Sequence, residues 1–400
     1  MAATRPTILQ IIPALDTGGA ELSTVEIATA IVAGGGRAIV VTSGGRLAAS
    51  IVEAGGEIIP FPAATKNPAK MMLNARALAA IIRRENVDLV HARSRAPAWT
   101  ALSAARATKR PFITTYHGAY NEKGPLKRAY NSVMARGDVV IANSEYTAHL
   151  IQTRYGTPKD RIRIIHRGVD HTTFDRALLA PERLAKLQAA WNIKPDQQVI
   201  LQAARLTKWK GQSVVIDALA QIIKANPVAN LIAVFAGDDQ GRTSYSDDLK
   251  RQIASLGLDT HVRLVGHVDD MPAAYALATV SIIASIEPEA FGRTAIEAQM
   301  MGCPVIATNI GAPPETVLAP PRTDAANRTG WLVAPGHAAE LAAALNEARN
   351  LNQAQRDALT CRAHDHVAAN FSLQAMKQAT LSVYDELLGS SLTGTQPTKT

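Results

Sequence analysis

Hydrophobic residues fall into short continuous runs that alternate with segments of helical period. In the first half of the chain, runs such as Thr7–Ile12 predict buried strands, and apolar positions recurring every three or four residues predict helices between them. The predicted strands are Thr7–Ile12, Ala38–Thr42, Ile58–Phe61, Leu89–His91, Phe112–Tyr116, Val139–Asn143 and Ile162–Ile165, and the clearest helices are Glu21–Ala33, Leu73–Glu85 and Pro125–Ala135. Such alternation favours a parallel, doubly wound α/β sheet.

A second series of strands and helices follows. Its predicted strands are Val199–Ala203, Leu231–Ala236, Val262–Val265, Val280–Ala284, Val305–Ala307 and Gly330–Val333. We therefore predict two Rossmann-like domains, residues 1–170 and 197–370, facing each other across a central cleft. Residues 171–196 are predicted as a linker and entry helix, 371–389 as a C-terminal helix, and 390–400, which are poor in apolar residues, as a disordered tail.

Length and composition fit this plan. A chain of 400 residues with 47% apolar content can bury two ordinary cores. It contains no uncharged apolar run of membrane-spanning length, and its first residues lead directly into a strand without the features of a secretory signal. The two cysteines, Cys303 and Cys361, provide neither a disulfide framework nor a metal cluster. We expect a cytoplasmic protein.

Charge is distributed unevenly. Residues 1–170 hold 22 Lys and Arg against 12 Asp and Glu, a net charge of +10, whereas the remainder holds 20 against 22, a net charge of −2. A basic half suggests an anionic partner: nucleic acid, an acidic lipid or a phosphorylated glycan. Only 4% of the residues are aromatic, and no helix-turn-helix, zinc-finger or basic-aromatic pattern occurs. We therefore expect no nucleic-acid partner.

Two carboxylates, Glu289 and Glu297, flank a predicted turn between a strand and a helix. Glu289 is expected in the loop at the carboxyl end of the strand, and Glu297 about one turn inside the helix, pointing toward the same crevice. The backbone N–H groups of Phe291 and Gly292 would face that crevice, where anions are favoured and where open α/β sheets bind ligands. Acidic residues near a helix start also serve as simple caps.

Two further loops carry candidate chemistry. Arg205 and Lys210 flank the loop after the first strand of the second domain, where a forked guanidinium and a point charge suit a diphosphate. Gly18 and Gly19 follow the first strand of the chain, and paired glycines let a backbone approach a ligand closely. This loop is neither a dinucleotide fingerprint nor a P-loop, which counts against a dehydrogenase or an ATPase.

Together these stretches resemble the retaining glycosyltransferases of family 4, which have the GT-B fold. The family motif Glu-x-Phe-Gly-x4-Glu is matched from Glu289 to Glu297, and its Arg-Leu-x3-Lys-Gly motif from Arg205 to Gly211. The loop at Gly18 and Gly19 is similar to the family's Gly-Gly-x-Glu loop. The resemblance covers residues 7 to 385 and is strongest between 200 and 316.

The resemblance implies roles for these positions. Glu289 would approach the donor sugar, Glu297 would hydrogen-bond the ribose, and Arg205 and Lys210 would bind the diphosphate. The glycine loop would reach across the cleft to the donor phosphate and the acceptor. The last helix would cross back to the first domain, as it does in the family.

His117, directly after a predicted strand, occupies the place of a family histidine that lies near the reacting sugar. Outside that resemblance, a lone histidine is more often a structural hydrogen-bonding group. His117 and Glu289 are thus the catalytic candidates. Two departures from the family are Arg167, where an asparagine is usual, and Ala312, in place of the second glycine of Gly-Gly-x-x-Glu. The chain's Asp-Asp pairs are not the Asp-x-Asp of metal-dependent sugar transferases, so we expect no catalytic metal and no cofactor.

The resemblance implies transfer of a sugar, with retention, from a UDP- or GDP-sugar to a glycan or lipid-linked acceptor. Lipopolysaccharide or another cell-envelope polysaccharide is the expected product. Two alternatives remain from the sequence: another two-domain sugar-nucleotide enzyme, either an epimerase or a phosphorylase-like protein, and a non-catalytic sugar-nucleotide-binding protein.

Two basic segments of the first half contain apolar residues, a combination suited to an anionic membrane surface. The first has Lys66, Lys70, Arg76, Arg83 and Arg84 among Met71, Met72, Leu73 and Leu78, and the second has Lys123, Lys127 and Arg128 with Leu126, Val133 and Met134. An ordinary solvated helix face is the alternative interpretation. We hypothesise that this half docks on the cytoplasmic membrane.

Overall fold

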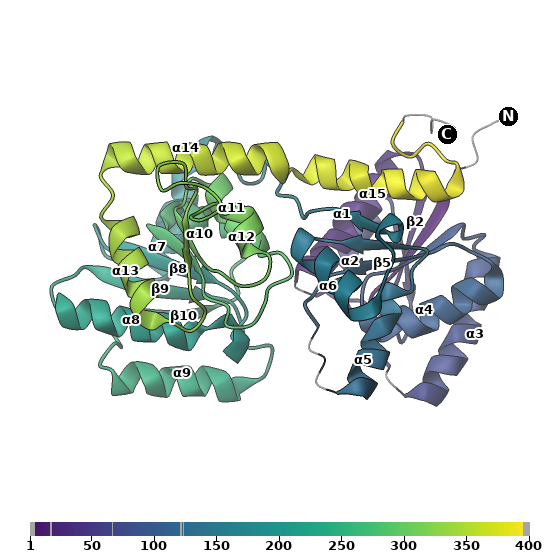
Figure 1. The fold of residues 1–400 in the computed structure, drawn as a ribbon, viewed down its shortest axis with the longest axis horizontal. Coiled ribbons are helices and arrows are strands. Elements are labelled where there is room, and N and C mark those ends of the chain that lie inside the picture. Colours follow the sequence, from purple (N-terminus) through teal and green to yellow (C-terminus); the bar gives the residue numbers. More distant parts are fainter. Residues whose placement is uncertain (1–4, 17, 66, 121, 123, 395–400) are drawn as a thin grey trace. The chain divides into compact units, whose positions relative to one another are not determined.

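The computed structural model describes residues 5–16, 18–65, 67–120, 122 and 124–394. It divides into two compact units, each an α/β layer structure around its own parallel sheet (Figure 1). Unit 1 comprises Met1–His166 with Gln374–Thr400, and unit 2 comprises Arg167–Leu373. No helix in the described part of the chain combines the length and apolar character needed to cross a membrane.

Unit 1 has a parallel sheet of strand order β3-β2-β1-β4-β5-β6-β7. Its strands are β1 (Thr7–Ile11), β2 (Arg37–Thr42), β3 (Glu57–Pro60), β4 (Leu89–Ala92), β5 (Phe112–Tyr116), β6 (Val139–Ala142) and β7 (Ile162–Ile164). Its helices are α1 (Gly19–Ala33), α2 (Ala48–Glu53), α3 (Pro68–Arg84), α4 (Arg95–Thr108), α5 (Pro125–Asn131), the 3-10 helix η1 (Ser132–Ala135), α6 (Glu145–Tyr155), the 3-10 helix η2 (Lys159–Arg161) and α15 (Leu373–Leu388). The central strands are fully buried, as in parallel sheets covered on both faces, and this explains their continuous apolar runs.

Unit 2 has a parallel sheet of strand order β10-β9-β8-β11-β12-β13. Its strands are β8 (Gln198–Ala203), β9 (Leu231–Ala236), β10 (Val262–Gly266), β11 (Val280–Ile283), β12 (Val305–Thr308) and β13 (Trp331–Val333). Its helices are η3 (Arg176–Leu178), α7 (Pro181–Ala190), η4 (Lys208–Lys210), α8 (Gln212–Ala225), α9 (Thr243–Ser255), α10 (Met271–Leu277), α11 (Arg293–Met300), α12 (Pro313–Thr316), α13 (Ala338–Arg349) and α14 (Gln353–Asn370), η3 and η4 being 3-10 turns. The strand order reverses between β8 and β11, and in unit 1 between β1 and β4. Such switch points form the ligand crevices of doubly wound sheets.

The predicted fold class is confirmed, since each predicted strand has a counterpart in one of the two sheets. One predicted helix is shorter than expected, because Pro125–Ala135 divides into α5 and the 3-10 turn η1.

The boundary between the units differs from the predicted one at residue 170. Residues 167–170 belong to unit 2 because Val169 pairs with Ser372, with the Val169 N–H donating to Phe371 O at 2.9 Å. The predicted linker, residues 171–196, is also a packed part of unit 2. Its helix α7 is held by a forked ion pair from Arg183 to Asp270, and Trp191 is buried in the unit 2 core.

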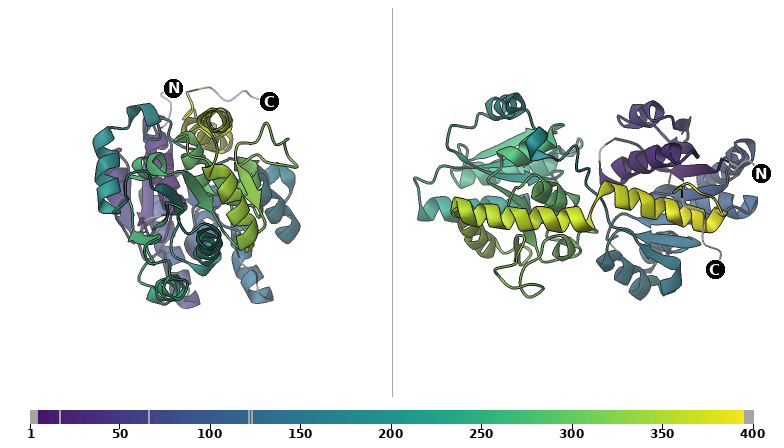
Figure 2. Two further views of the ribbon diagram at one scale, coloured as in Figure 1. Left: turned by 90° about the vertical axis from the view of Figure 1, so that its left-hand side faces the viewer. Right: turned by 90° about the horizontal axis from the view of Figure 1, so that it is seen from above.

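The C-terminal helix α15 belongs to unit 1, where it lies alongside α1 (Figure 2). The first residues of the predicted disordered tail are ordered. Leu392 is buried, and the Asp385 carboxylate accepts hydrogen bonds from Ser390 Oγ at 2.6 Å and from the backbone N–H groups of Leu392 and Thr393 at 2.7 and 2.9 Å. The prediction is therefore wrong for residues 390–394, while 395–400 lie outside the described residues.

The two basic segments are only partly on the surface. Leu78, Val133 and Met134, predicted as membrane-facing residues, are fully buried in the core of unit 1, because they lie on the inner faces of α3 and η1. The exposed apolar residues of these segments are Met72, Leu73 and Leu126. Lys66 and Lys123 lie outside the described residues.

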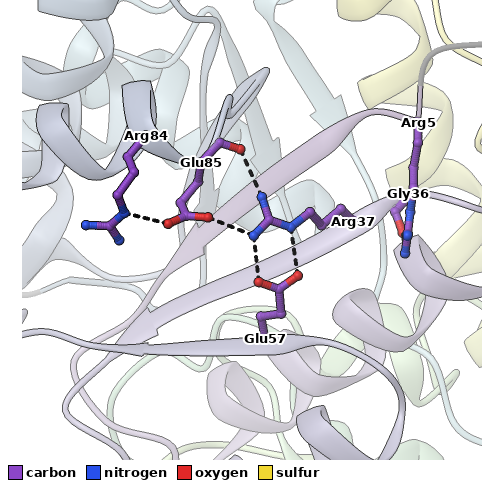
Figure 3. Close-up of polar contacts among 6 residues, drawn as sticks. All are labelled: Arg5, Gly36, Arg37, Glu57, Arg84 and Glu85. Carbon is purple, nitrogen blue, oxygen red and sulfur yellow. Dashed lines mark hydrogen bonds and ion pairs between the residues drawn. The ribbon is translucent and has the colours of Figure 1, made fainter.

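At the amino ends of the unit 1 strands, Arg37 joins three elements (Figure 3). Its guanidinium donates two hydrogen bonds of 2.7 Å to Glu57 at the start of β3 and one of 2.8 Å to Glu85 after α3. Arg84 donates to the other Glu85 oxygen at 2.7 Å. Arg37 lowers the pKa of both carboxyl groups, and the carboxylates raise the pKa of Arg37.

Candidate functional site

Two loops meet at the carboxyl ends of β8 and β11, the switch point of unit 2. The loop after β8 contains Arg205 and Lys210, and the loop after β11 contains Glu289. The Ile286 N–H donates to Trp209 O at 2.8 Å and so joins the two loops. Gln202, buried in β8, donates to Lys210 O at 2.7 Å and fixes the end of the first loop.

Lys210 and Glu289 form a buried ion pair there. The Lys210 Nζ lies 2.6 Å from Glu289 Oε1, and the two side chains are only 17% and 9% exposed. The same carboxylate oxygen accepts a hydrogen bond from Ser285 Oγ. The ammonium also lies 4.2 Å from the centroid of the Trp209 ring, a cation–π contact. The pair is thus positioned by groups from both loops.

The backbone of Glu289 is supported from the loop after β12. Gly311 adopts a φ of +79° and passes so close that a Cβ there would lie 2.4 Å from Glu289 O. Ala312 donates its N–H to the same oxygen at 2.9 Å and has a negative φ. Position 311 therefore requires glycine and has it. Ala312, which departs from the family pattern, is sterically acceptable.

Glu297 lies one turn into α11, as predicted, and is buried. Arg293, four residues earlier on the helix, donates to Glu297 Oε1 at 2.8 Å, and Tyr275 OH from α10 donates to Oε2 at 3.2 Å. Burial, together with the Glu297 charge, raises the pKa of Tyr275 well above its usual value, so the phenol stays protonated as a donor. Both oxygens of Glu297 are thereby oriented.

The remaining predicted donor residues of unit 2 differ in exposure. Arg205 is exposed, and its guanidinium donates to Gln240 Oε1 at 3.2 Å. The Phe291 side chain is buried and packs edge-on against Phe371, with centroids 5.7 Å apart. The Phe291 side chain is therefore part of the core of unit 2. Gly292, with a left-handed φ of +84°, immediately precedes α11.

Gly18, Gly19 and His117 lie in unit 1. Gly18 precedes α1, in the loop after β1, and Gly19 is the first residue of that helix. The Glu21 carboxylate folds back over Gly18, so that a Cβ at position 18 would lie 2.5 Å from Glu21 Oε2. His117 directly follows β5 and is half-buried. All three are therefore at carboxyl ends of strands, as the sequence predicts.

Sequence reasoning missed the residues that position the two glutamates. Arg293 has the four-residue spacing from Glu297 that typifies helical ion pairs, so this contact could have been found. Ser285 comes directly after an apolar run, a weaker signal. Tyr275 comes from another helix and has no signal near the motif.

A buried polar cluster in unit 1 was also missed. His91 in β4 contacts Tyr384 OH of α15 and Thr115 Oγ1, each at 2.7 Å. Arg93 is 2% exposed and donates to Ser23 Oγ of α1 at 2.6 Å, and its burial lowers its pKa to about 10. Burial also lowers the pKa of His91 well below its usual value. The His91–Tyr384 contact holds α15 against the sheet of unit 1, and the Arg93–Ser23 hydrogen bond does the same for α1.

Each of the two units matches a known protein family. Residues 17–173 match the family model Glycosyltransferase Family 4, and residues 185–363 match Glycosyl transferases group 1. A glycosyltransferase structure from Rickettsia africae ESF-5 is 35% identical, with a TM-score of 0.86, over 96% of this chain and 99% of that chain. The structure of Anabaena HepE in complex with UDP-glucose is 25% identical, with a TM-score of 0.80, over 95% of this chain and 100% of that chain.

The chain is also similar to a curated glycosyltransferase. D-inositol 3-phosphate glycosyltransferase from Jonesia denitrificans is 27% identical over 255 residues, which is 63% of this chain and 58% of that enzyme. The chain thus spans less than two thirds of the length of this curated relative, whereas it spans nearly all of the Rickettsia structure. With both family models matched and the Rickettsia protein similar from end to end, the chain belongs to glycosyltransferase family 4 and has the GT-B fold.

Proposed function

We propose that this glycosyltransferase moves a sugar from a nucleoside diphosphate sugar to a glycan or lipid-linked acceptor, with retention of configuration and without a metal ion. The observation that carries the proposal is the buried Lys210–Glu289 pair at the switch point of unit 2. A lysine and a carboxylate are held there by two loops at strand ends, where doubly wound sheets bind ligands. The similarity to HepE, whose structure contains UDP-glucose, supports a nucleotide-sugar donor.

Charge on the leaving diphosphate is the main electrostatic demand of such a reaction. An ammonium has three N–H donors, so Lys210 can keep its bond to Glu289 and still donate to a phosphate oxygen. Arg205, exposed on the same loop, and the N-terminus of α11 after Gly292 add positive potential. These groups would supply the charge that a divalent ion provides in metal-dependent transferases.

The two glutamates have different proposed tasks. Glu297, oriented by Arg293 and Tyr275, would accept hydrogen bonds from the ribose hydroxyls. Glu289, fixed by Lys210 and Ser285, would orient the transferred sugar. The departing phosphate would take the proton of the acceptor hydroxyl on the same face of the sugar, which preserves the anomeric configuration. His117, whose family counterpart lies near the reacting sugar, is the second proposed catalytic residue.

The basic unit 1 favours an acceptor with negative charge. The excess of Lys and Arg over Asp and Glu lies in residues 1–170, and the similar enzyme from Jonesia is named for a phosphorylated polyol. We propose a lipopolysaccharide or other cell-envelope glycan as the acceptor, elongated at the inner face of the cytoplasmic membrane with unit 1 docked on anionic lipid. The family assignment favours sugar transfer over the epimerase, phosphorylase-like and non-catalytic alternatives.

The test is incubation of the purified chain with UDP-, GDP- and ADP-sugars and candidate acceptors. Release of the nucleoside diphosphate, with a product that NMR shows to keep the donor's anomeric configuration in metal-free buffer, is the expected result. Release of a hexose phosphate, or an inverted product, would contradict the proposal.

A further inference from the structure

A groove of about 560 Å³ lies between three helices of unit 1, α3, α4 and α5. These helices are on the right-hand side of Figure 1. Its volume falls within the range of sites for small ligands. The lining is mainly apolar and includes Met71, Met72 and Ala75 of α3, Trp99 of α4 and Tyr130 of α5. The groove is separate from every candidate sugar-transfer residue described above.

Tyr130 and Trp99 give this groove its polar and aromatic character. The Tyr130 hydroxyl is buried and has no hydrogen-bond partner in the described structure, and its burial raises its pKa. Trp99 donates its Nε1–H to Tyr130 O at 3.0 Å and carries the Arg136 guanidinium 4.9 Å above its ring, so its indole is held as part of the wall. An apolar wall with a guanidinium at its edge suits an amphiphile that has a negative head.

The charge around the groove has one sign. The helices α3, α4 and α5 contain Lys70, Arg76, Arg83, Arg84, Arg95, Arg106, Lys127 and Arg128, and no Asp or Glu. Of these, Lys70, Arg76, Lys127 and Arg128 are exposed and form no ion pair with a carboxylate among the described residues. An uncompensated basic surface of this extent is complementary to an anionic lipid surface.

Exposed apolar side chains accompany these cations. Leu73 in α3 and Leu126 in the first turn of α5 are 60% and 87% exposed, and Met72, which also lines the groove, is 59% exposed. Large apolar side chains beside Lys and Arg are typical of elements that enter the boundary between head groups and acyl chains.

We propose that the groove takes an acyl chain of an anionic membrane phospholipid, while the cations at its rim hold the phosphate of the head group. The inference deepens the proposed membrane docking and rests on it. It specifies that unit 1 inserts into the bilayer at a chain-binding groove rather than resting on the head groups through charge alone.

Trp99 provides a direct readout. Vesicles of phosphatidylcholine and phosphatidylglycerol with brominated acyl chains should quench its emission, since a bromine atom must approach the indole closely. The other tryptophans, Trp191, Trp209 and Trp331, are in unit 2, so Trp99 quenching is the part lost in a Trp99→Phe variant. Neutral brominated vesicles should quench much less, and added salt should reduce the effect.

A groove-filling variant separates chain binding from surface attachment. Ala75→Phe should still sediment with anionic vesicles but lose the quenching of Trp99, with an unchanged melting temperature to show that it folds. Lys70→Ala and Lys127→Ala should weaken sedimentation, whereas Lys159→Ala, an exposed lysine of unit 1 outside the three helices, should not.

Wild-type quenching no greater than that of Trp99→Phe would overturn the proposal, as would undiminished quenching of Ala75→Phe. These measurements need no sugar transfer, so a failure of the proposed enzymatic function would leave their outcome unaffected.

Discussion

Two clusters of paired charges lie at opposite ends of parallel strands. Arg37, Glu57 and Glu85 join at the amino ends of strands in unit 1 (Figure 3), and Lys210 and Glu289 pair at the carboxyl ends in unit 2. Arg37 and Glu57 are 28% and 47% exposed, whereas Lys210 and Glu289 are 17% and 9% exposed. The first cluster is partly exposed to solvent, and Arg37 lies 2.7 and 2.8 Å from the carboxylates of Glu57 and Glu85. The second is buried at the position where such sheets bind ligands.

The presence of an ion pair therefore does not by itself identify a functional site; its burial and its place in the fold also matter. A surface pair contributes little stability and needs no function to explain it. A buried pair costs desolvation that its attraction barely offsets, so replacing both partners often leaves a protein as stable as before. The Lys210–Glu289 pair is therefore better explained by a functional role than by a contribution to stability.

The largest effect is expected from the buried pair. Lys210→Met leaves a buried carboxylate unpaired, and Glu289→Gln leaves a buried ammonium unpaired, so each should cost about 3 kcal/mol of unfolding free energy. Sugar transfer should fall at least ~100-fold in each variant. Denaturant unfolding and initial rates measure the two effects.

The double variant is the matched control for these two. With both charges removed, most of the lost stability should return, and the double-mutant cycle should give a coupling free energy. Activity should stay low, because the double variant has no ammonium group at position 210 to bind the diphosphate. Recovery of activity along with stability would mean that the pair serves folding only.

Next in size is Glu297. Glu297→Ala should weaken nucleotide-sugar affinity by about 10- to 100-fold, the loss expected for hydrogen bonds to a charged group. Arg293→Ala should give a smaller loss, because Tyr275 still holds the carboxylate. Calorimetric titration measures both. Equal nucleotide-sugar affinities of the wild type and Glu297→Ala would show that Glu297 does not contact the donor.

Arg205 and Lys208, two exposed cations of the loop after β8, allow a test substitution and its matched control. Arg205→Ala should weaken donor affinity by about tenfold, since Arg205 faces solvent on the proposed diphosphate side. Lys208, 79% exposed and 3.9 Å from Asp248, should be replaceable by Ala without effect. Equal losses from both substitutions would indicate a general charge effect rather than a specific contact.

The smallest effect is expected at Arg37. Arg37→Met should leave sugar transfer unchanged and cost about 1 kcal/mol of stability at pH 7, because the pair with Glu57 is partly exposed. Arg37 lowers the folded-state pKa of Glu57 and Glu85, so its stabilising effect is complete above their usual pKa of 4.5 and is lost as the pH falls through the lowered values. Melting curves should show the gap between wild type and variant closing in acid. A gap that widens in acid would contradict this sign.

Much of the fold was accessible from the sequence because the buried parallel strands are continuous apolar runs, as at Leu231–Ala236. The sequence placed Glu289 and Lys210 in loops that follow strands, and the structure shows the two side chains in contact there. What escaped prediction depends on tertiary contact: Leu392 is buried in unit 1, and Asp385 accepts hydrogen bonds from the backbone of Leu392 and Thr393. Likewise, Phe291 belongs to the family motif, but its side chain packs in the core against Phe371, which is distant in sequence.

Nucleotide binding by two folded variants tests directly whether the buried Lys210–Glu289 pair belongs to the donor site. Wild type, Arg37→Met and the Lys210→Met/Glu289→Gln double variant would each be titrated calorimetrically with UDP- and GDP-sugars, after circular dichroism has shown that all three are folded. We expect wild-type affinity for Arg37→Met and a loss of about tenfold or more for the double variant. Wild-type affinity in the folded double variant would contradict the claim that the buried pair at the strand ends of unit 2 belongs to the donor site.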